Sequence, residues 1–277
     1  MPATWEWDET LYEGSAAFYV AGRRPYPAVV ADALRARLGL DGSGRLLDVG
    51  CGPGPLTLLL APLFGSAVGI DADAAMLECA RQAARRAGID NVGWHQMRAE
   101  ALPAALGSFR VVTFAQSFHW TDQLLVAGLI RQMLEPGGAC VLVYANTHEG
   151  IGGDDALPSP RPPRGQIGDL IARYLGSVRR AGRGALPDGL ANGAESALRE
   201  AGFQGPARTE VGGGDIWDRT EDEVVASVFS LSSAAPHLFG DRLAAFEHEL
   251  RGILRSSSPG GHFCERARPV GLEIWRP

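Results

Sequence analysis

The sequence predicts an α/β protein built on a doubly wound, mostly parallel sheet with helices on both of its faces. Between residues 45 and 144, short apolar runs alternate with amphipathic stretches, which is the order of parallel strands joined by crossover helices. A glycine-rich turn follows the first of these runs, as at the ligand-binding edge of such sheets. The chain has 277 residues, enough for one large domain with a substantial core.

The elements of this core follow one another through short turns. Pro27 suits the first turn of a helix over 28–38. Asp73 is a suitable N-cap for a helix that runs through Arg86, and Gly88 suits the end of that helix. Further helices are expected at 56–63 and 122–134. The expected strands are 45–49, 67–70, 92–97, 109–115 and 139–144, the last of them entered through the PGG turn at 136–138.

The second half of the chain has weaker signals. Residues 145–166 are rich in Gly, Pro and Asp and predict a long loop. A strand or hairpin is expected at 204–217, broken by the glycines at 212–214, and a final strand at 263–275. Asn192 is the expected N-cap of a helix whose Glu195 completes a variant capping box. Apolar periodicity predicts helices at 167–181, 193–201, 221–231 and 241–255.

Composition excludes several classes of function. All 26 basic residues are arginine, so no lysine is present for a Schiff base or a P-loop. The formal net charge of −6 gives no basic footprint for nucleic acid, and no apolar run reaches the roughly 18 residues of a membrane span. The N-terminal stretch lacks the apolar core of a signal peptide, and the cysteines lack the close spacing of metal or redox pairs. We therefore expect a cytoplasmic protein with no metal, nucleic-acid or membrane partner.

The sequence LLDVGCGPGPLTLLL at 46–60 carries the functional argument. Gly50, Gly52 and Gly54 follow a strand and precede a helix, so the backbone can approach a ligand closely and offer free N–H groups. Asp71 ends the next strand, which places a carboxylate at the same edge of the sheet, in reach of ribose hydroxyls. The pattern predicts a site for an adenosine-type nucleoside.

Two details separate the possible nucleoside ligands. The glycines run G-x-G-x-G rather than G-x-G-x-x-G, the dinucleotide spacing. Asp48 precedes them, and its carboxylate would repel a pyrophosphate. It would instead take a cationic amino-acid ligand or hold the loop through the loop's own N–H groups. Cys51 is best explained as a small side chain that the loop tolerates.

Residues 48–54, Asp-Val-Gly-Cys-Gly-Pro-Gly, resemble motif I of the class I S-adenosylmethionine-dependent methyltransferases. The segments at 19–27 and 115–120 resemble a small-molecule branch that includes trans-aconitate-type and ubiquinone-biosynthesis-type enzymes. The match spans about residues 19–145. In chain order the further matching segments are YVAGRRPYP at 19–27, GIDADAAML at 69–77, RAEALP at 98–103, AQSFHW at 115–120 and LEPGGACVLV at 134–143.

The resemblance implies a Rossmann-like sheet of seven strands. The sixth strand would lie near 204–217 and an antiparallel seventh near 263–275. The single domain would then comprise an N-terminal cap at 1–27, an S-adenosylmethionine-binding core at 28–145, and a helical substrate-side insertion with the last strands at 146–277.

The resemblance also implies S-adenosyl-L-methionine as cofactor and S-adenosyl-L-homocysteine as product. Asp71 would bind the ribose, Ala72 and Met76 would border the adenine, and Ala99 and Glu100 would lie beside it. The full set of implied cofactor-binding residues is Tyr19, Arg23, Asp48, Gly50, Cys51, Gly52, Gly54, Asp71, Ala72, Met76, Ala99, Glu100, Gln116 and Ser117.

His119 and Trp120 follow the fourth strand at the ligand edge of the sheet, and with Tyr26 they form the expected substrate-binding set. His119 is a candidate general base, because the ordinary pKa of imidazole suits proton transfer near neutral pH. The alternative is that it fixes the loop through a hydrogen bond. Residues 116–119 read Gln-Ser-Phe-His, whereas methyltransferases that act on DNA or on release factors resemble one another in a Pro-Pro-aromatic motif here. This difference indicates a small-molecule acceptor.

We therefore expect methyl transfer to an O, N or C atom of a small molecule, by a monomer or a homodimer. Transfer from a sulfonium needs alignment and exclusion of water more than covalent help. Three alternatives stay open. One is an enzyme of the same fold that binds S-adenosylmethionine but performs cyclisation or elimination, and the others are an NAD(P)-dependent oxidoreductase and a non-catalytic binding protein.

Overall fold

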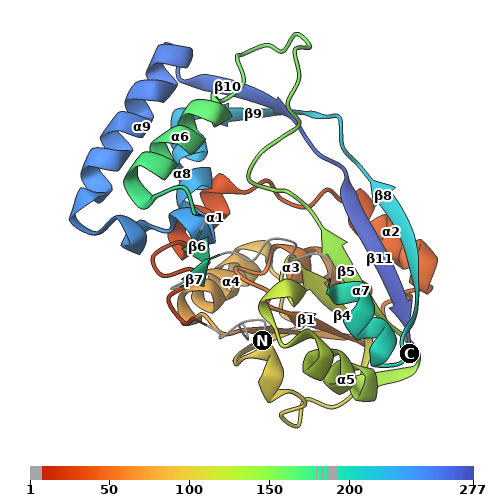
Figure 1. The fold of residues 1–277 in the computed structure, drawn as a ribbon. Helices are drawn as coiled ribbons and strands as arrows, with labels where there is room; N and C mark the ends of the chain where they lie inside the picture. Colours follow the sequence, from red (N-terminus) through yellow and green to blue (C-terminus); the bar gives the residue numbers. More distant parts are fainter. Residues whose placement is uncertain (1–7, 179, 182–183, 186–192) are drawn as a thin grey trace.

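A computed structural model describes residues 8–178, 180–181, 184–185 and 193–277. Its central sheet contains β1 (Arg45–Val49), β2 (Ser66–Asp71), β3 (Val92–Gln96), β4 (Phe109–Ala115), β5 (Leu134–Tyr144), β8 (Gln204–Val211) and β11 (Val270–Arg276). The strands lie in the order β3-β2-β1-β4-β5-β11-β8 (Figure 1). β11 is antiparallel to both of its neighbours, and the other neighbouring pairs are parallel. This is the predicted doubly wound sheet with an antiparallel seventh strand.

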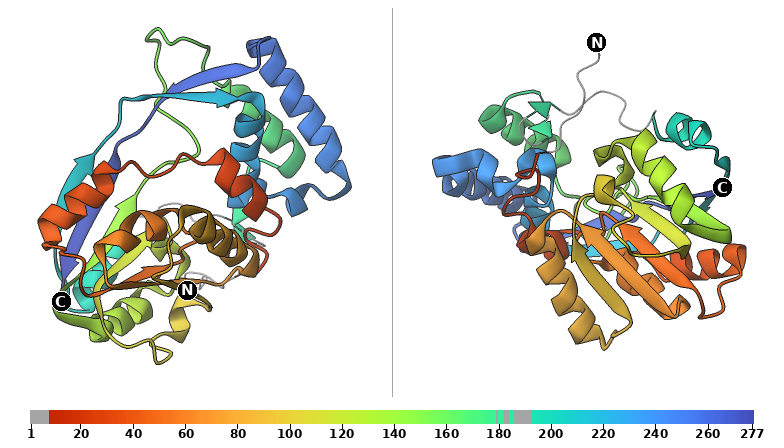
Figure 2. Two further views of the ribbon diagram at one scale, coloured as in Figure 1. Left: turned by 180° about the vertical axis from the view of Figure 1, so that it is seen from behind. Right: turned by 90° about the horizontal axis from the view of Figure 1, so that it is seen from below.

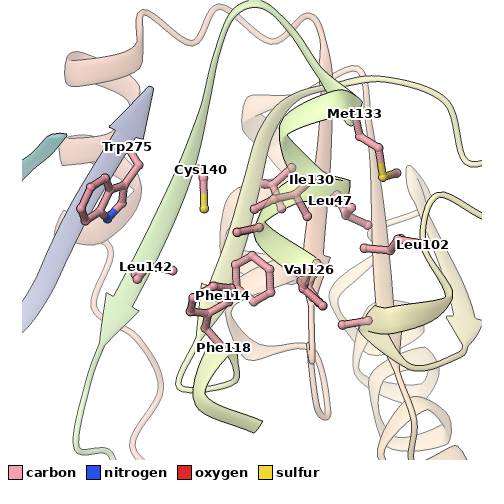
Figure 3. Close-up of a cluster of buried hydrophobic side chains, with 14 of the residues drawn as sticks. Leu47, Leu102, Phe114, Phe118, Val126, Ile130, Met133, Cys140, Leu142 and Trp275 are labelled. Carbon is pink, nitrogen blue, oxygen red and sulfur yellow. The ribbon is translucent and has the colours of Figure 1, made fainter. Parts of the chain in front are cut away.

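Helices cover both faces of this sheet because the side chains of each strand alternate between the faces. On one face, α2 (Val29–Leu38) and α3 (Pro55–Leu60) pack on a cluster that includes Leu46 and Val141. On the other face, α5 (Gln123–Met133) and α7 (Ala194–Glu200) pack on a cluster around Phe114 and Trp275 (Figure 3). The two apolar layers make the sheet a rigid platform for whatever lies at its edges.

An outer unit extends beyond the sheet, and the stretches from β8 to β9 (Ile216–Thr220) and from β10 (His262–Arg266) to β11 run side by side between the two (Figures 1 and 2). The outer unit consists of α6 (Arg164–Leu175), α8 (Glu221–Phe229), α9 (Leu243–Ser257) and a two-stranded sheet of β9 and β10. Its core is separate and aromatic, with Phe229, Phe239, Phe246 and Phe263 buried together. α1 (Ala16–Gly22) packs against α8, so the N-terminal segment links the outer unit to the central sheet.

Several elements are confirmed with their predicted ends. β1 and β4 span the expected residues. α4 (Ala74–Ala87) begins where Asp73 accepts hydrogen bonds from the N–H groups of Ala75 and Met76. It ends at Gly88, whose φ of +66° is the left-handed conformation expected at a helix end.

Two predicted strand segments are wrong in the way they pair. Residues 204–217 do not form a hairpin, because β8 pairs with β11 whereas β9 pairs with β10 in the outer unit. The three glycines at 212–214 all have positive φ and let the chain leave the central sheet. Residues 263–275 form two strands, β10 and β11, because Pro269 has no N–H for a continuous ladder.

The predicted helices differ from the structure mainly at their ends. α6 ends at Leu175, before Gly176 at φ +89°, so the helix predicted over 167–181 is wrong beyond that residue. Residues 180–181 instead pair with 184–185 as the short strands β6 (Arg180–Ala181) and β7 (Gly184–Ala185). The N-cap of α7 is Gly193, with no side-chain cap, and Asn192 lies outside the described residues. β5 already begins at Leu134, so the PGG turn lies within an irregular part of the strand. Among the described residues, no helix has both the length and the apolar character to cross a bilayer.

Candidate functional site

A cleft lies at the carboxyl ends of β1, β2 and β4, with the N-terminal segment along one side. It encloses about 800 Å³ of empty space, counting the part that is open to solvent. The parallel strands all deliver their last residues to this edge, which is where ligands bind in open α/β sheets. The predicted site residues that line the cleft are Tyr19, Gly50, Gly52, Asp71, Ala72, Met76, Ala99, Glu100, Gln116, Ser117 and Trp120.

The glycine loop, residues 50–54, joins β1 to α3 at the floor of the cleft. Gly50 and Gly52 have φ angles of +65° and +55°, in the left-handed region that favours glycine. A Cβ at Gly50 would also lie 2.5 Å from the Cβ of Ser117, so a side chain there would force apart the ends of β1 and β4. The loop therefore presents backbone, rather than side chains, to the cleft.

Asp71 ends β2 and fastens the glycine loop to the cleft wall. Its Oδ2 accepts a hydrogen bond of 2.8 Å from the N–H of Gly52, and its Oδ1 accepts one of 2.9 Å from the N–H of Asp73. Burial raises the pKa of Asp71 to about 6, against the opposing effect of these backbone hydrogen bonds. The side chain is thus held in one orientation at the cleft wall and is ionised at neutral pH.

Asp48 lies below the glycine loop and is 0% exposed. Its carboxylate accepts hydrogen bonds from the hydroxyls of Thr57 at 2.5 Å and Thr113 at 2.7 Å. Burial raises the pKa of Asp48 to about 6. It does not line the cleft, and its side chain bonds to hydroxyls of α3 and β4 rather than to the N–H groups of the glycine loop.

Two other predicted residues of the loop face the protein interior. Cys51 is buried and burial raises the pKa of its thiol, which fits a small side chain tolerated in the loop. Gly54 begins α3, and a Cβ there would lie 2.7 Å from the indole ring of Trp94. Neither residue lines the cleft, and both shape the loop from below.

The residues implied to flank adenine lie together on one wall. Ala72 and Met76 come from the end of β2 and the first turn of α4, and Ala99 and Glu100 follow β3. The Oε1 of Glu100 also accepts a hydrogen bond of 2.9 Å from the N–H of Asp122, the N-cap of α5. Glu100 therefore fixes the start of a helix as well as contributing a carboxylate to the wall.

Of the three N-terminal residues in the predicted site, Tyr19, Arg23 and Tyr26, only Tyr19 lines the cleft. The guanidinium of Arg23 lies 4.5 Å from the centroid of the Tyr19 ring and donates hydrogen bonds to the hydroxyl and carbonyl of Ser230, each at 2.8 Å. Tyr26 lines a separate, smaller hollow beside Ala145 and Trp217, and burial raises its pKa. Arg23 thus supports Tyr19 from outside the cleft, and Tyr26 lies apart from it.

His119 does not line the cleft, although its neighbour Trp120 does. The two rings pack with centroids 4.6 Å apart. Burial lowers the pKa of His119 to about 4, so the imidazole is neutral at pH 7 and a weak base. The structure therefore favours a role in fixing the loop over the alternative role of general base.

Gln116, the residue after β4, has a strained backbone at the cleft wall. Its φ is +58°, a conformation that non-glycine residues rarely adopt and that clusters at functional sites. The side-chain amide donates a hydrogen bond of 3.2 Å to the carbonyl of Ala145, just after β5. This contact holds the loops after β4 and β5 together.

Other residues that line the cleft were not singled out from the sequence: Glu9, Tyr12, Val49, Asp73, Met97, Arg98, Ala115 and Thr121. Val49, Met97 and Ala115 end a strand or directly follow one, so the rule that ligands meet the carboxyl edge would have found them. Glu9 and Tyr12 come from a segment of turns before α1. The only feature of the sequence that could have pointed to this segment is the high proportion of aromatic residues among the first 26.

Negative charge predominates among the described lining residues. Glu9, Asp71, Asp73 and Glu100 contribute carboxylates, whereas Arg98 contributes the guanidinium and lies 3.2 Å from Glu100. Such a cleft favours a ligand that carries positive charge and opposes a pyrophosphate. S-adenosylmethionine has a cationic sulfonium and ammonium, so the residues present fit this cofactor.

Comparisons with known proteins agree with the fold. Residues 46–138 match a family model described as a methyltransferase domain. The ubiquinone biosynthesis O-methyltransferase of Psychrobacter arcticus is 34% identical over 114 residues, which cover 40% of this chain and 44% of that protein. The trans-aconitate 2-methyltransferase of Paracidovorax citrulli is 28% identical over 212 residues, which cover 75% of this chain and 60% of that protein.

A solved structure shares the fold. A protein designated a type II methyltransferase, from Anaeromyxobacter dehalogenans, matches with a TM-score of 0.51 and 20% identity over 91% of this chain and 95% of that one. Residues 46–138 are thus similar to a methyltransferase domain, and the chain has the fold of this solved structure. The chain spans about half the length of the first curated relatives that it matches.

Proposed function

We propose that the protein transfers a methyl group from S-adenosylmethionine to an O, N or C atom of a small-molecule acceptor and releases S-adenosylhomocysteine. The observation that carries this proposal is the acidic cleft at the glycine loop, with the Asp71 carboxylate fixed at its wall. A cation with a ribose satisfies both features, because the ribose hydroxyls can donate to Asp71 while the sulfonium gains from the carboxylates.

In this proposal, different residues of the cleft bind different parts of the cofactor. The backbone of Gly50 and Gly52 lies against the cofactor, and Asp71 accepts hydrogen bonds from the ribose. Met76 and Met97 supply apolar surface for the adenine. When bound, the cofactor supplies a methyl group on a sulfonium that is already a good leaving group. The protein then has to align the acceptor and exclude water.

The N-terminal segment acts in this proposal as a cap, and the residues after 145 supply the substrate side. Tyr12 and Tyr19 support the first role, because they line the cleft opposite the sheet. The acceptor is proposed to be a small molecule because residues 116–119 differ from the Pro-Pro-aromatic motif. The similarity to proteins named for trans-aconitate and for ubiquinone biosynthesis points the same way.

The first test is calorimetric titration with S-adenosylhomocysteine. Asp71→Ala removes a charged hydrogen-bond acceptor, which should cost about 1.5–3 kcal/mol, or roughly ten- to a hundredfold in affinity. Glu78→Gln, an exposed substitution on α4 away from the cleft, is the matched control and should bind like the native protein. Thermal melts of each variant check that the fold is retained.

Two results would contradict the proposal. Absence of binding to the native protein at concentrations well above micromolar would mean that the glycine loop serves another ligand. Turnover that yields methylthioadenosine or an unmethylated isomer, rather than a methylated acceptor and S-adenosylhomocysteine, would assign the protein to non-methylating chemistry on the same fold.

A further inference from the structure

A second cavity lies between α6 and α8, apart from the cleft, and is called here the α6–α8 cavity. It encloses about 1090 Å³ of empty space, counting the part open to solvent, which is ample for a small molecule. Arg164, Ser227 and His148 meet where α6 begins, at one part of its wall. The apolar walls are formed mainly by Ile167, Ile171, Leu175, Val228 and Leu231.

The charge at this part of the wall is unbalanced. Arg164 lies 2.7 Å from a carboxylate oxygen of Glu265, and Arg219 lies 3.0 Å from the same oxygen. Among the residues that the structure describes, no carboxylate other than that of Glu265 lies within ion-pair distance of the Arg164 or the Arg219 guanidinium. Two guanidiniums therefore share one carboxylate as their ion-pair partner, and Glu223 adds a longer-range attraction to Arg219. The side chains of Arg219 and Glu265 are 0% and 4% exposed, whereas that of Arg164 is 26% exposed and lines the cavity.

A second carboxylate on the cavity wall does not cancel this excess. Glu149 lines the cavity, but its Oε1 accepts a hydrogen bond of 3.0 Å from the amide of Asn146 and lies 3.7 Å from Arg268. Glu149 and Arg268 therefore balance each other. The Arg164 guanidinium donates to Glu265 through Nε and Nη2, and its Nη1 faces the hydroxyl of Ser227 at the cavity wall. A carboxylate in the cavity would meet the guanidinium at Nη1.

The cavity approaches the cleft at two places, with a thin partition between them. Tyr12 lines the cleft and is hydrogen-bonded to Ser232, whose neighbours Leu231 and Ser233 line the cavity. Gln116 of the cleft donates a hydrogen bond to Ala145, whose neighbour Asn146 lines the cavity. Residues of the cleft wall are thus hydrogen-bonded to sequence neighbours of residues that line the cavity.

The cavity follows α6 along its length. Arg164 is the first residue of this helix, and Leu175 is its last. At 1.5 Å per residue, the 12 residues of α6 span about 18 Å. An occupant bound at Arg164 therefore has room for an extended apolar body.

We propose that the α6–α8 cavity is the acceptor pocket, and that the acceptor is an apolar molecule with a carboxylate bound by Arg164. This assignment rests on the proposed methyl transfer, which requires an acceptor beside the cofactor cleft. The carboxylate anchors the acceptor where α6 begins, and the apolar walls enclose its body.

The charge requirement is tested with octanoate, titrated by calorimetry in the presence of saturating S-adenosylhomocysteine, with octylamine as the opposite-charge probe. Octanoate should bind, and Arg164→Gln should weaken binding at least tenfold. Glu265 keeps Arg219 as its partner in that variant. Arg173→Gln is the matched control, because this residue is 60% exposed on the same helix and pairs with Glu249. It should change octanoate affinity less than twofold, and octylamine should bind at least tenfold more weakly than octanoate.

The location is tested by filling the cavity. Gly168 lines it, and a Cβ built there meets nothing within 4 Å, so Gly168→Leu adds a bulky side chain at the cavity wall without a clash. This variant should lose octanoate binding at least tenfold. Gly165→Leu on the same helix is the control, since its Cβ is also unobstructed and it does not line the cavity. Octanoate should bind to this control as to the native protein.

The outcomes separate this inference from the proposed function. Native-like binding of octanoate to Gly168→Leu overturns the location, and native-like binding to Arg164→Gln overturns the carboxylate. If the native protein binds S-adenosylhomocysteine but not octanoate, the acceptor class is wrong while the cofactor assignment stands. If octanoate binds as expected and S-adenosylhomocysteine does not, the proposed function fails and the cavity is a ligand site of another kind.

Discussion

At the scale of single residues, Asp48 shows how a carboxylate near a ligand site can serve the fold. Its two oxygens are satisfied by Thr57 and Thr113, so the charge never needs to meet a ligand. Asp71 ends the neighbouring strand, β2. Burial raises its pKa to about 6 as well, but this residue lines the cleft. The two carboxyl groups therefore have similar pKa values but different roles, and the difference between the roles follows from where each residue lies relative to the cleft.

Asp48→Asn should flatten the dependence of stability on pH. Because burial raises the pKa of Asp48 from 3.8 to about 6, the folded state holds a proton that the unfolded state has lost between these values. The native protein therefore loses free energy of unfolding as pH rises through this window, by about 2 kcal/mol from this group. Asparagine does not titrate, so urea unfolding at pH 4, 5, 6 and 7 should show a smaller decline for the variant. Parallel curves for the two proteins would refute this account.

The sequence predicts residues whose position follows from the backbone alone. Asp71, Gly50 and Gly52 line the cleft because strand ends and a glycine turn place them there whatever the rest of the chain does. Arg23 and His119 illustrate the limit, since both are near the cleft in sequence yet have side chains packed outside it. Their orientation depends on contacts with α8 and Trp120, which spacing along the chain does not encode.

At the scale of elements, the contact between α1 and α8 decides where the N-terminal tyrosines lie. A Cβ at Gly22 would come within 2.4 Å of the backbone of Ala226 and Ser227, so the two helices can approach this closely only with glycine at that position. Tyr12 and Tyr19 reach the cleft from this docked segment. Glycine at 22 is thus a structural requirement of the cleft wall.

Gly22→Ala should weaken both stability and cofactor binding. Overpacking against backbone typically costs about 1–3 kcal/mol, and a displaced α1 would move Tyr19 away from the cleft. We expect lower unfolding midpoints in urea and weaker S-adenosylhomocysteine binding by calorimetry. Gly128→Ala on α5, where a Cβ meets nothing within 4 Å, should leave binding unchanged and keep or raise stability. A native-like affinity for Gly22→Ala would show that α1 does not position the cleft wall.

The ends of helices and strands could be predicted where the sequence contains capping residues. Asp73 and Gly88 bound α4 by local hydrogen bonds, and these are visible in the sequence. The division of residues 262–276 between two sheets depends on which strands they meet across space. Pro269 marks a break between the two strands, but apolar residues suit either sheet, so the pattern of the sequence alone does not assign each strand to its sheet.

At the scale of the whole molecule, buried charges hold the outer unit to the rest of the protein. Glu265 of β10 binds Arg164 of α6 and Arg219 of β9, and it accepts a hydrogen bond of 3.0 Å from the N–H of Gly150. Arg219 in turn donates a hydrogen bond of 3.0 Å to the carbonyl of Gly22 in α1. One carboxylate thereby joins the outer unit, the loop after β5 and the N-terminal helix.

Glu265→Gln should destabilise the protein strongly. Burial, and then the charge of Arg164, lower the pKa of Arg219 only to about 10. The Arg219 guanidinium therefore stays charged at pH 7, and in the variant it would lose its buried counter-charge. Breaking a buried ion pair on one side typically costs about 3–5 kcal/mol. Glu247→Gln, a half-exposed partner of Arg251 on α9, should cost less than about 1 kcal/mol. Equal unfolding midpoints in urea for the two variants would contradict this role of Glu265.

The position of β11 also sets the order in which the chain can fold as it is synthesised. β11 pairs with β5 on one side and β8 on the other, so β8 has no place in the sheet until residues 270–276 have left the ribosome. The parallel strands β1 to β5 can assemble earlier, which leaves the edge of β5 open during translation. Such an edge is a template for pairing with other chains. A nascent chain stalled before residue 270 is therefore the species most exposed to aggregation, and chaperone contacts should concentrate there.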